Sequence, residues 1–164
     1  MGFMLVHVPA FAGNSRADDI HSNIAYVVDV DSGEVLVDRN SSVISPIASI
    51  SKLMASIVVL DSGQGLMEPV RIEREDVARQ SSAKWKLQVG TEISRKRTLR
   101  IGLMSSENRA INALARSYVG GRDAFVAAMN LKAKELGMAH THFIEPTGLS
   151  SQNVSTAQDL VLLL

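Results

Sequence analysis

The sequence has no cysteine, no excess of either charge and no long apolar run, and each absence excludes a class of protein. Without cysteine the chain has no disulfide, zinc–cysteine site or thiol nucleophile. The 17 basic and 17 acidic side chains balance, so we expect no nucleic-acid partner. No apolar stretch is long enough to span a bilayer, so no transmembrane segment is expected. The 164 residues suffice for one globular domain with a buried core.

Aromatic residues are also scarce, at 4% of the chain, and none lies in its densest basic stretch, residues 95–100. A basic surface that binds nucleic acid usually carries aromatic side chains among its cations. We therefore interpret this stretch as the solvated start of a helix and not as an anion site.

The first twelve residues resemble the second half of a secretory signal. Residues 3–12 form an apolar run that ends in Ala10-Phe11-Ala12, and polar residues follow at once. The positive start of a signal is missing, so either its front is lost or the start codon is misplaced; an apolar N-terminal arm is the alternative. We expect export, a flexible segment over residues 13–22 and one folded domain over residues 23–164.

The hydrophobic pattern predicts a hairpin followed by several helices. Apolar residues over 24–30 and 35–37 flank a turn, which indicates a β-hairpin. Helices are predicted from Ser49 to about residue 61, over 97–104, around 111–118, over 123–136 and from a capping box of Ser155 and Gln158 onward. The predicted inward residues of the first helix are Ile50, Leu53, Met54, Ile57 and Val58. A two-stranded hairpin is marginal alone, and no later strand is evident to pair with it.

Ser49 and Lys52 form a Ser-x-x-Lys pair at the start of the first predicted helix. Helix positions i and i+3 share a face, so the Lys52 amine can reach the Ser49 hydroxyl. Ser51 points elsewhere and is the poorer nucleophile. The first helical turn offers unpaired N–H groups and a positive dipole end, which stabilise an oxyanion. Taken alone, the pair is more often structural, because a capping serine and a later lysine are common.

A second polar pair, Ser106 and Asn108, interrupts two predicted helices. The hydroxyl of Ser106 can relay a proton, and the amide of Asn108 can hold a substrate peptide bond. The alternative is that both residues only cap the next helix. A Ser-x-x-Lys on a buried helix followed by Ser-x-Asn on a loop is the arrangement of penicillin-binding proteins and class A β-lactamases.

The chain resembles the low-molecular-mass penicillin-binding proteins, the D-alanyl-D-alanine carboxypeptidase/endopeptidase family, peptidase S11. The matching stretches are residues 46–54, 103–110, 145–150 and 153–157. The Ser-Glu-Asn form of the second motif is similar to the penicillin-binding protein 7 type of endopeptidase. The resemblance implies an α+β fold like that of β-lactamases and DD-peptidases, a helical cluster against an antiparallel sheet. It further implies that residues 23–164 form an incomplete serine DD-peptidase catalytic domain that works in the periplasm. Such a domain hydrolyses D-Ala-D-X bonds in peptidoglycan peptides through an acyl-enzyme, and β-lactam antibiotics acylate it.

The same resemblance assigns roles to four residues. Ser49 would be the acylated nucleophile, Lys52 its general base, and Ser106 the residue that passes the proton to the leaving amine. Asn108 would bind the substrate backbone, and the Ser49 N–H would be one oxyanion donor. No cofactor or metal is implied. His140 and His142 could lie on one side of a strand and bind a metal, but no third ligand is evident.

The family's third motif, Lys-Thr-Gly, does not occur in the 164 residues. In the family it follows the region that ends here at Leu164, so the resemblance implies a C-terminally truncated member whose later strands are missing. The missing lysine would be a second cation that helps to lower the pKa of Lys52, and at an ordinary pKa of ~10.4 only ~0.04% of Lys52 is neutral at pH 7. The missing strand would also carry the second oxyanion N–H, and losing such a donor costs ~3–4 kcal/mol. We therefore expect this chain alone to be a weak or inactive peptidase. The alternative function is a non-catalytic remnant that binds peptidoglycan or a partner enzyme.

Overall fold

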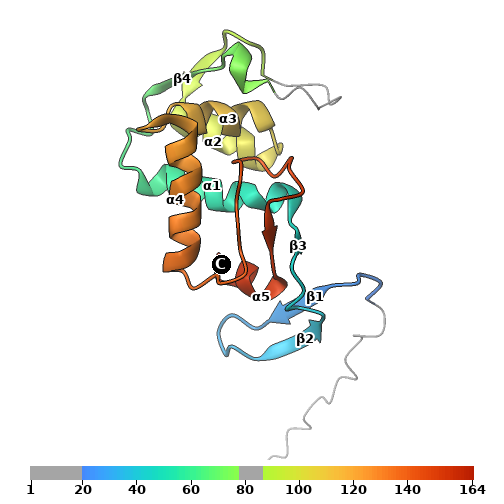
Figure 1. Ribbon diagram of the computed structural model, residues 1–164. Coiled ribbons are helices and arrows are strands. Elements are labelled where there is room, and N and C mark those ends of the chain that lie inside the picture. The colour runs from blue at the N-terminus through green and yellow to red at the C-terminus, as the bar shows by residue number, and fades with distance from the viewer. Residues whose placement is uncertain (1–19, 78–86) are drawn as a thin grey trace, which may run out of the picture. The chain divides into compact units, whose positions relative to one another are not determined.

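The computed structural model describes residues 20–77 and 87–164, which divide into two units after Ser41 (Figure 1). The signal-like segment and most of the expected flexible segment lie outside the described residues. In the part of the chain that is described, no helix is long and apolar enough to cross a membrane.

The first unit is the β-hairpin that the sequence predicts. Strand β1, Ala25–Val28, pairs antiparallel with β2, Val35–Arg39. The carboxylate of Asp29 closes the turn by accepting the backbone N–H of Ser32 at 2.8 Å and its hydroxyl at 2.9 Å. The short polar side chain of Asp29 therefore accepts hydrogen bonds from groups in the turn that the strand pairing does not satisfy.

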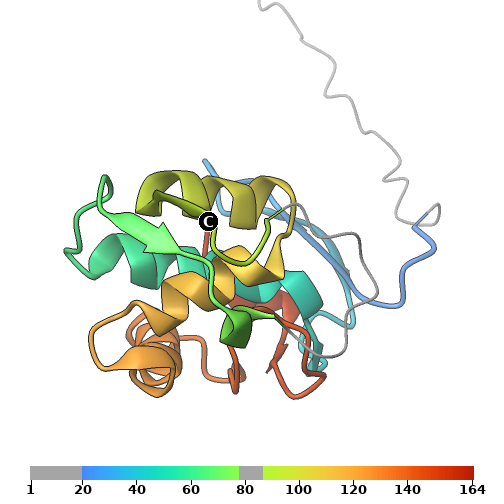
Figure 2. The same ribbon diagram turned by 90° about the horizontal axis from the view of Figure 1, so that it is seen from above.

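The second unit is a helical cluster arranged around α1. Its helices are α1 (Ser51–Asp61), α2 (Arg95–Met104), α3 (Asn108–Arg116), α4 (Gly121–Glu135) and α5 (Ala157–Val161). Helix α1 lies at the centre, in contact with α2, α3 and α4 (Figures 1 and 2). The largest apolar core side chains are Met54, Ile72, Ile111, Leu114, Phe125, Met129 and Phe143. Burying each of them contributes about 1.5–3 kcal/mol before entropy is counted.

Two short strand pairs complete this unit. Strand β3, Ser45–Pro46, pairs antiparallel with β6, Val154–Ser155, and so joins the segment before Ser49 to the end of the chain. Strand β4, Pro69–Arg71, pairs antiparallel with β5, Glu92–Ser94. The fold is thus α+β, with helices and small antiparallel sheets, as expected.

The first predicted helix differs from the observed one. Ser49 lies in a short 3-10 turn, Ala48–Ile50, and α1 begins only at Ser51. Two residues predicted to face inward, Ile50 and Leu53, are more than 40% exposed, whereas Ser51 and Lys52 are buried. The prediction was wrong here because the polar side of α1 is covered by residues 145–153, which hydrogen-bond to it.

The start of the last helix also differs from the prediction. Thr156, and not Ser155, caps α5 by accepting the N–H of Asp159 at 3.0 Å. The hydroxyl of Ser155 is buried and bonds to Thr141 at 2.7 Å. Two adjacent hydroxyl residues offer the same capping chemistry, so the sequence alone could not choose between them.

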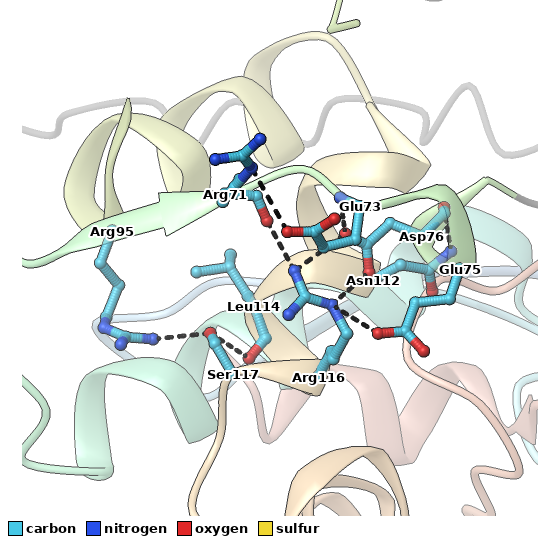
Figure 3. A network of polar contacts seen from close by, with 9 residues as sticks. All are labelled: Arg71, Glu73, Glu75, Asp76, Arg95, Asn112, Leu114, Arg116 and Ser117. Atoms are coloured by element: carbon cyan, nitrogen blue, oxygen red, sulfur yellow. Dashed lines mark hydrogen bonds and ion pairs between the residues drawn. The ribbon is translucent and has the colours of Figure 1, made fainter. Parts of the chain in front are cut away.

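The basic stretch does begin a helix, α2, but it is not wholly solvated. Arg95 is buried, and its guanidinium donates to the Ser117 hydroxyl at 3.1 Å (Figure 3). It also lies 3.3 Å from the Glu68 carboxylate. Lys96, Arg97 and Arg100 are exposed. The expectation of a solvated stretch was therefore wrong for Arg95, because burial there is compensated by partners that are distant in sequence.

A second buried charge ties the turn after β4 to α3. Asp76, at the end of the 3-10 turn Arg74–Asp76, is fully buried. Arg116 reaches both of its carboxylate oxygens, at 3.0 and 3.1 Å, and also donates to the Arg71 carbonyl at 2.6 Å (Figure 3). Asn112 donates to the Asp76 carbonyl at 3.0 Å. The hydrogen bonds to Asp76 raise the pKa of Arg116, so its guanidinium stays charged.

Candidate active site

The side chains of Ser49, Lys52 and Ser106 meet just before α1. The Lys52 amine donates to Ser49 Oγ at 2.8 Å, and the Ser106 hydroxyl donates to the same oxygen at 2.9 Å. Ser49 is exposed, whereas Lys52 is only 3% exposed. The Ser49 hydroxyl, which a substrate can approach, therefore contacts the Lys52 amine, which is shielded from solvent. The structure brings these three residues together as the sequence suggested, and their catalytic roles stay predictions.

Burial changes the acid–base behaviour of Lys52. Desolvation lowers the pKa of its amine to about 8, against the opposing effect of the Glu145 and Glu107 carboxylates. Roughly a tenth of such amines are neutral at pH 7, compared with ~0.04% at the ordinary pKa. Lys52 can therefore accept a proton near neutral pH without a second cation beside it.

Two residues of the site adopt left-handed backbone angles that are unusual outside glycine. Ala48, which precedes the candidate nucleophile, has a φ of +46°, and Ser106 has a φ of +51°. Each such residue costs about 1–3 kcal/mol and persists only where surrounding contacts hold it. The loop 145–150 supplies such a contact, because the backbone of Gly148 packs against Ala48.

Gly148 lies so close to Ala48 that no side chain fits. Its φ is +81°, and a Cβ built there would be 1.7 Å from the Ala48 carbonyl oxygen. We expect Gly148→Ala to destabilise the fold by more than the ~1–2 kcal/mol that the left-handed angle alone costs. The matched control is Gly137→Ala, at a φ of +80° with no atom within 4 Å. Urea unfolding of both variants measures the difference, and equal losses would contradict the close packing of this loop.

The loop 145–150 received no role from sequence reasoning, yet it holds Lys52. The Thr147 carbonyl accepts from the Lys52 amine at 2.7 Å. The Glu145 carboxylate accepts the N–H groups of Thr147 at 2.8 Å and of Gly148 at 2.5 Å. A signal existed in the sequence, since an acidic residue ahead of Pro-Thr-Gly is typical of a tight turn. Only the distant contact with Lys52 makes this turn part of the site.

Asn153 fastens the same loop to α1. It is fully buried, and its amide donates to the Ser51 hydroxyl at 3.0 Å and to the Glu145 carbonyl at 2.8 Å. Its side-chain oxygen accepts the N–H of Ile144 at 2.9 Å. Ser51 is thus occupied and buried, which agrees with the expectation that it is the poorer nucleophile.

Asn108 is the first residue of α3, and it does not join the other three residues through a hydrogen bond. The helix cap is Glu107, whose side chain accepts the N–H of Arg109. The side-chain oxygen of Asn108 is buried, and no residue that the structure describes donates to it. A buried acceptor left unpaired costs about 1–3 kcal/mol. This oxygen is covered from solvent, so the structure does not present it to a ligand, and the substrate-binding role of Asn108 stays a prediction.

The two histidines do not gather metal ligands around them. Over residues 20–77 and 87–164, no three His, Cys, Asp or Glu side chains are placed to hold a metal ion. His140 Nδ1 lies 3.9 Å from the carboxylate of Asp159, and the backbone of His142 pairs with Val154.

Comparison with known proteins gives this geometry its context. Residues 12–164 match the family described as D-alanyl-D-alanine carboxypeptidase, peptidase S11. The chain is 47% identical over 156 residues to a D-alanyl-D-alanine endopeptidase of Pseudomonas aeruginosa, covering 95% of this chain and 50% of that protein. It is 45% identical over 155 residues to the D-alanyl-D-alanine endopeptidase of Escherichia coli, covering 94% and 50%. The chain therefore spans about half the length of these relatives.

Solved structures share the fold as well. A D-alanyl-D-alanine carboxypeptidase from Mycobacterium tuberculosis matches with a TM-score of 0.74 and 36% identity, over 84% of this chain and 52% of that one. Penicillin-binding protein 5 from Haemophilus influenzae matches with a TM-score of 0.76 and 30% identity, over 84% and 42%. These similarities confirm the family that the sequence motifs indicated. The chain belongs to the D-alanyl-D-alanine carboxypeptidase family, peptidase S11.

Proposed function

We propose that this chain carries the acylation site of a serine DD-peptidase that cleaves D-alanyl-D-X bonds in peptidoglycan peptides. The observation that supports this most strongly is the contact of exposed Ser49 with buried Lys52 and with Ser106. Relatives named as endopeptidases and carboxypeptidases for D-alanyl-D-alanine supply the substrate class. The substrate lies in the cell wall, so we also propose that the protein works outside the cytoplasm, in the periplasm.

In the proposed reaction, neutral Lys52 takes the proton of the Ser49 hydroxyl. The freed Oγ attacks the carbonyl carbon of the D-alanyl residue, and the carbonyl becomes a tetrahedral oxyanion near the Ser49 N–H. Collapse of the oxyanion breaks the C–N bond, and the proton passes from Lys52 through Ser106 to the leaving amine. Water then attacks the ester, gives a proton back through Lys52 and releases the peptide carboxylate and Ser49.

Asn108 is proposed to bind the peptide backbone, as the resemblance implies; its side-chain oxygen is buried and would have to become accessible to accept a peptide N–H. A β-lactam would react at the same serine, because its amide occupies the place of the D-alanyl-D-X bond and opens to a stable ester. Covalent capture of a β-lactam therefore tests the nucleophile directly and does not require hydrolytic turnover.

The deciding experiment is labelling with a fluorescent penicillin, followed by mass spectrometry of the intact chain. We expect one adduct on the parent chain and on Ser42→Ala, a control at an exposed serine, and none on Ser49→Ala. An adduct that survives Ser49→Ala would contradict the assigned nucleophile.

The alternative that the sequence leaves open is a chain that binds peptidoglycan or a partner enzyme without acylation. The outcome that favours it is an unlabelled parent chain that still sediments with purified peptidoglycan. The expectation that the chain hydrolyses peptides only weakly stays a prediction.

A further inference from the structure

Both carboxylate oxygens of Glu145 accept hydrogen bonds from its own loop, and one of them also accepts from Asn153. One oxygen accepts the Thr147 N–H at 2.8 Å and the Thr147 hydroxyl at 2.6 Å. The other accepts the Gly148 N–H at 2.5 Å and the Asn153 amide at 3.2 Å. A carboxylate occupied in this way is not available as a proton acceptor for water or substrate. Glu145 can therefore affect the reaction only through the groups that donate hydrogen bonds to it.

Three of those groups reach the segment that carries Ser49 and Lys52. The Thr147 carbonyl accepts from the Lys52 amine at 2.7 Å. The backbone of Gly148 packs against Ala48, the residue before Ser49. The Asn153 amide donates to the Ser51 hydroxyl at 3.0 Å. One side chain therefore organises three independent contacts with residues 48–52.

We propose that Glu145 is a positioning residue of the acyl-transfer site. Its carboxylate holds residues 145–150 in the turn that directs the Lys52 amine toward Ser49. This inference rests on the proposed function and deepens it. A neutral amine has two N–H bonds and one lone pair. When one N–H is fixed on the Thr147 carbonyl, the rotation of the amine is restricted and its lone pair can be held toward Ser49 Oγ, 2.8 Å away.

The charge of Glu145 has a second, separable effect on Lys52. It acts against the pKa lowering that burial causes, and so does the charge of Glu107. Glu107 differs from Glu145 because its side chain accepts the Arg109 N–H at the start of α3. A Glu107→Gln variant therefore removes a comparable charge without cutting the hydrogen bonds that shape the 145–150 loop.

The test compares Glu145→Gln, Glu107→Gln and the exposed control Glu92→Gln. The rate of covalent labelling by a fluorescent penicillin is measured from pH 6 to 10 for each. For Glu145→Gln we expect the pH midpoint to fall and the plateau rate to drop about 10- to 100-fold, the size of effect that a misplaced group causes. For Glu107→Gln we expect a lower midpoint with a smaller change in plateau, and for Glu92→Gln the parent profile.

The titration of Lys52 can be monitored by NMR of its ε-methylene group, and this readout does not require reaction with penicillin. If Glu145 only stabilises the fold, Glu145→Gln lowers the melting temperature and, through its lost charge, the Lys52 midpoint, but leaves the plateau rate of the folded fraction unchanged, which overturns the inference. If the parent is never labelled but the contact between Lys52 and the Thr147 carbonyl is lost in Glu145→Gln, the proposed function fails and the positioning role stands. If the parent is labelled through Ser49 and Glu145→Gln matches it throughout, only the inference fails.

Discussion

Replacing Lys52 with methionine is expected to slow acylation of Ser49 by about 10²- to 10⁴-fold, the usual contribution of a positioned general base. Methionine keeps an unbranched chain of similar length in the buried site, so packing is largely retained. The lost group is the amine that contacts Ser49 Oγ at 2.8 Å. Without it, the hydroxyl has no buried base to take its proton. The rate of Ser49 acylation is measured by stopping the reaction with a fluorescent penicillin at successive times and counting the labelled chains.

The pH profile gives the same prediction a second, independent readout. If the proposed base acts as a neutral amine, and because burial lowers its pKa to about 8, the parent rate should rise roughly tenfold per pH unit below that value and level off above it. Lys52→Met should remove this dependence. Lys134→Met, at an exposed lysine on α4, should keep both the rate and the profile. A Lys52→Met variant with the parent profile would show that another group is the base.

Replacing Arg116 with alanine is expected to destabilise the fold by about 3–5 kcal/mol, because it leaves a buried carboxylate without its cation. Asp76 is fully buried, and Arg116 supplies hydrogen bonds to both of its oxygens. One other donor to this carboxylate is the N–H of Glu73, at 2.7 Å. The buried carboxylate then loses its cation and two of its donors, which weakens the turn after β4. Urea unfolding followed by circular dichroism measures the loss.

The matched control for this prediction is Arg71→Ala. The side chain of Arg71 is 60% exposed, and its ion pair with Glu73 is worth about 0–1 kcal/mol. The double variant Arg116→Ala, Asp76→Ala should lose less than the sum of the two single losses, since removing both partners leaves no buried charge. An Arg116→Ala chain within about 1 kcal/mol of the parent, the range of an exposed pair, would exclude this role for the buried pair.

The sequence was most informative where the chemistry is local. The spacing of Ser49 and Lys52 placed hydroxyl and amine within reach, and that contact survives even though Ser49 lies in a 3-10 turn before the helix. One turn of either helix type brings residues three apart together, so the pairing did not depend on the exact helix start. The hairpin was predictable for the same reason, because its pattern and turn lie within a few neighbouring residues.

The sequence could not reveal which distant residues complete the site. Thr147 meets Lys52 across a separation of 95 residues, and Asn153 meets Ser51 across 102. Neither contact leaves a periodic signal, and the strand pairing that brings these segments together involves only two residues on each side. The burial of Lys52, and with it the lowered pKa, follows from this long-range packing.

The amino-acid sequence by itself therefore determined the family, the candidate nucleophile and its candidate base, because those depend on residue type and short spacing. Only the tertiary structure decided that Lys52 is desolvated, that Ser106 reaches Ser49, and that Glu145 accepts hydrogen bonds from the loop that contacts Lys52. Desolvation and loop geometry arise from atoms that are far apart along the chain, and folding alone puts those atoms in contact.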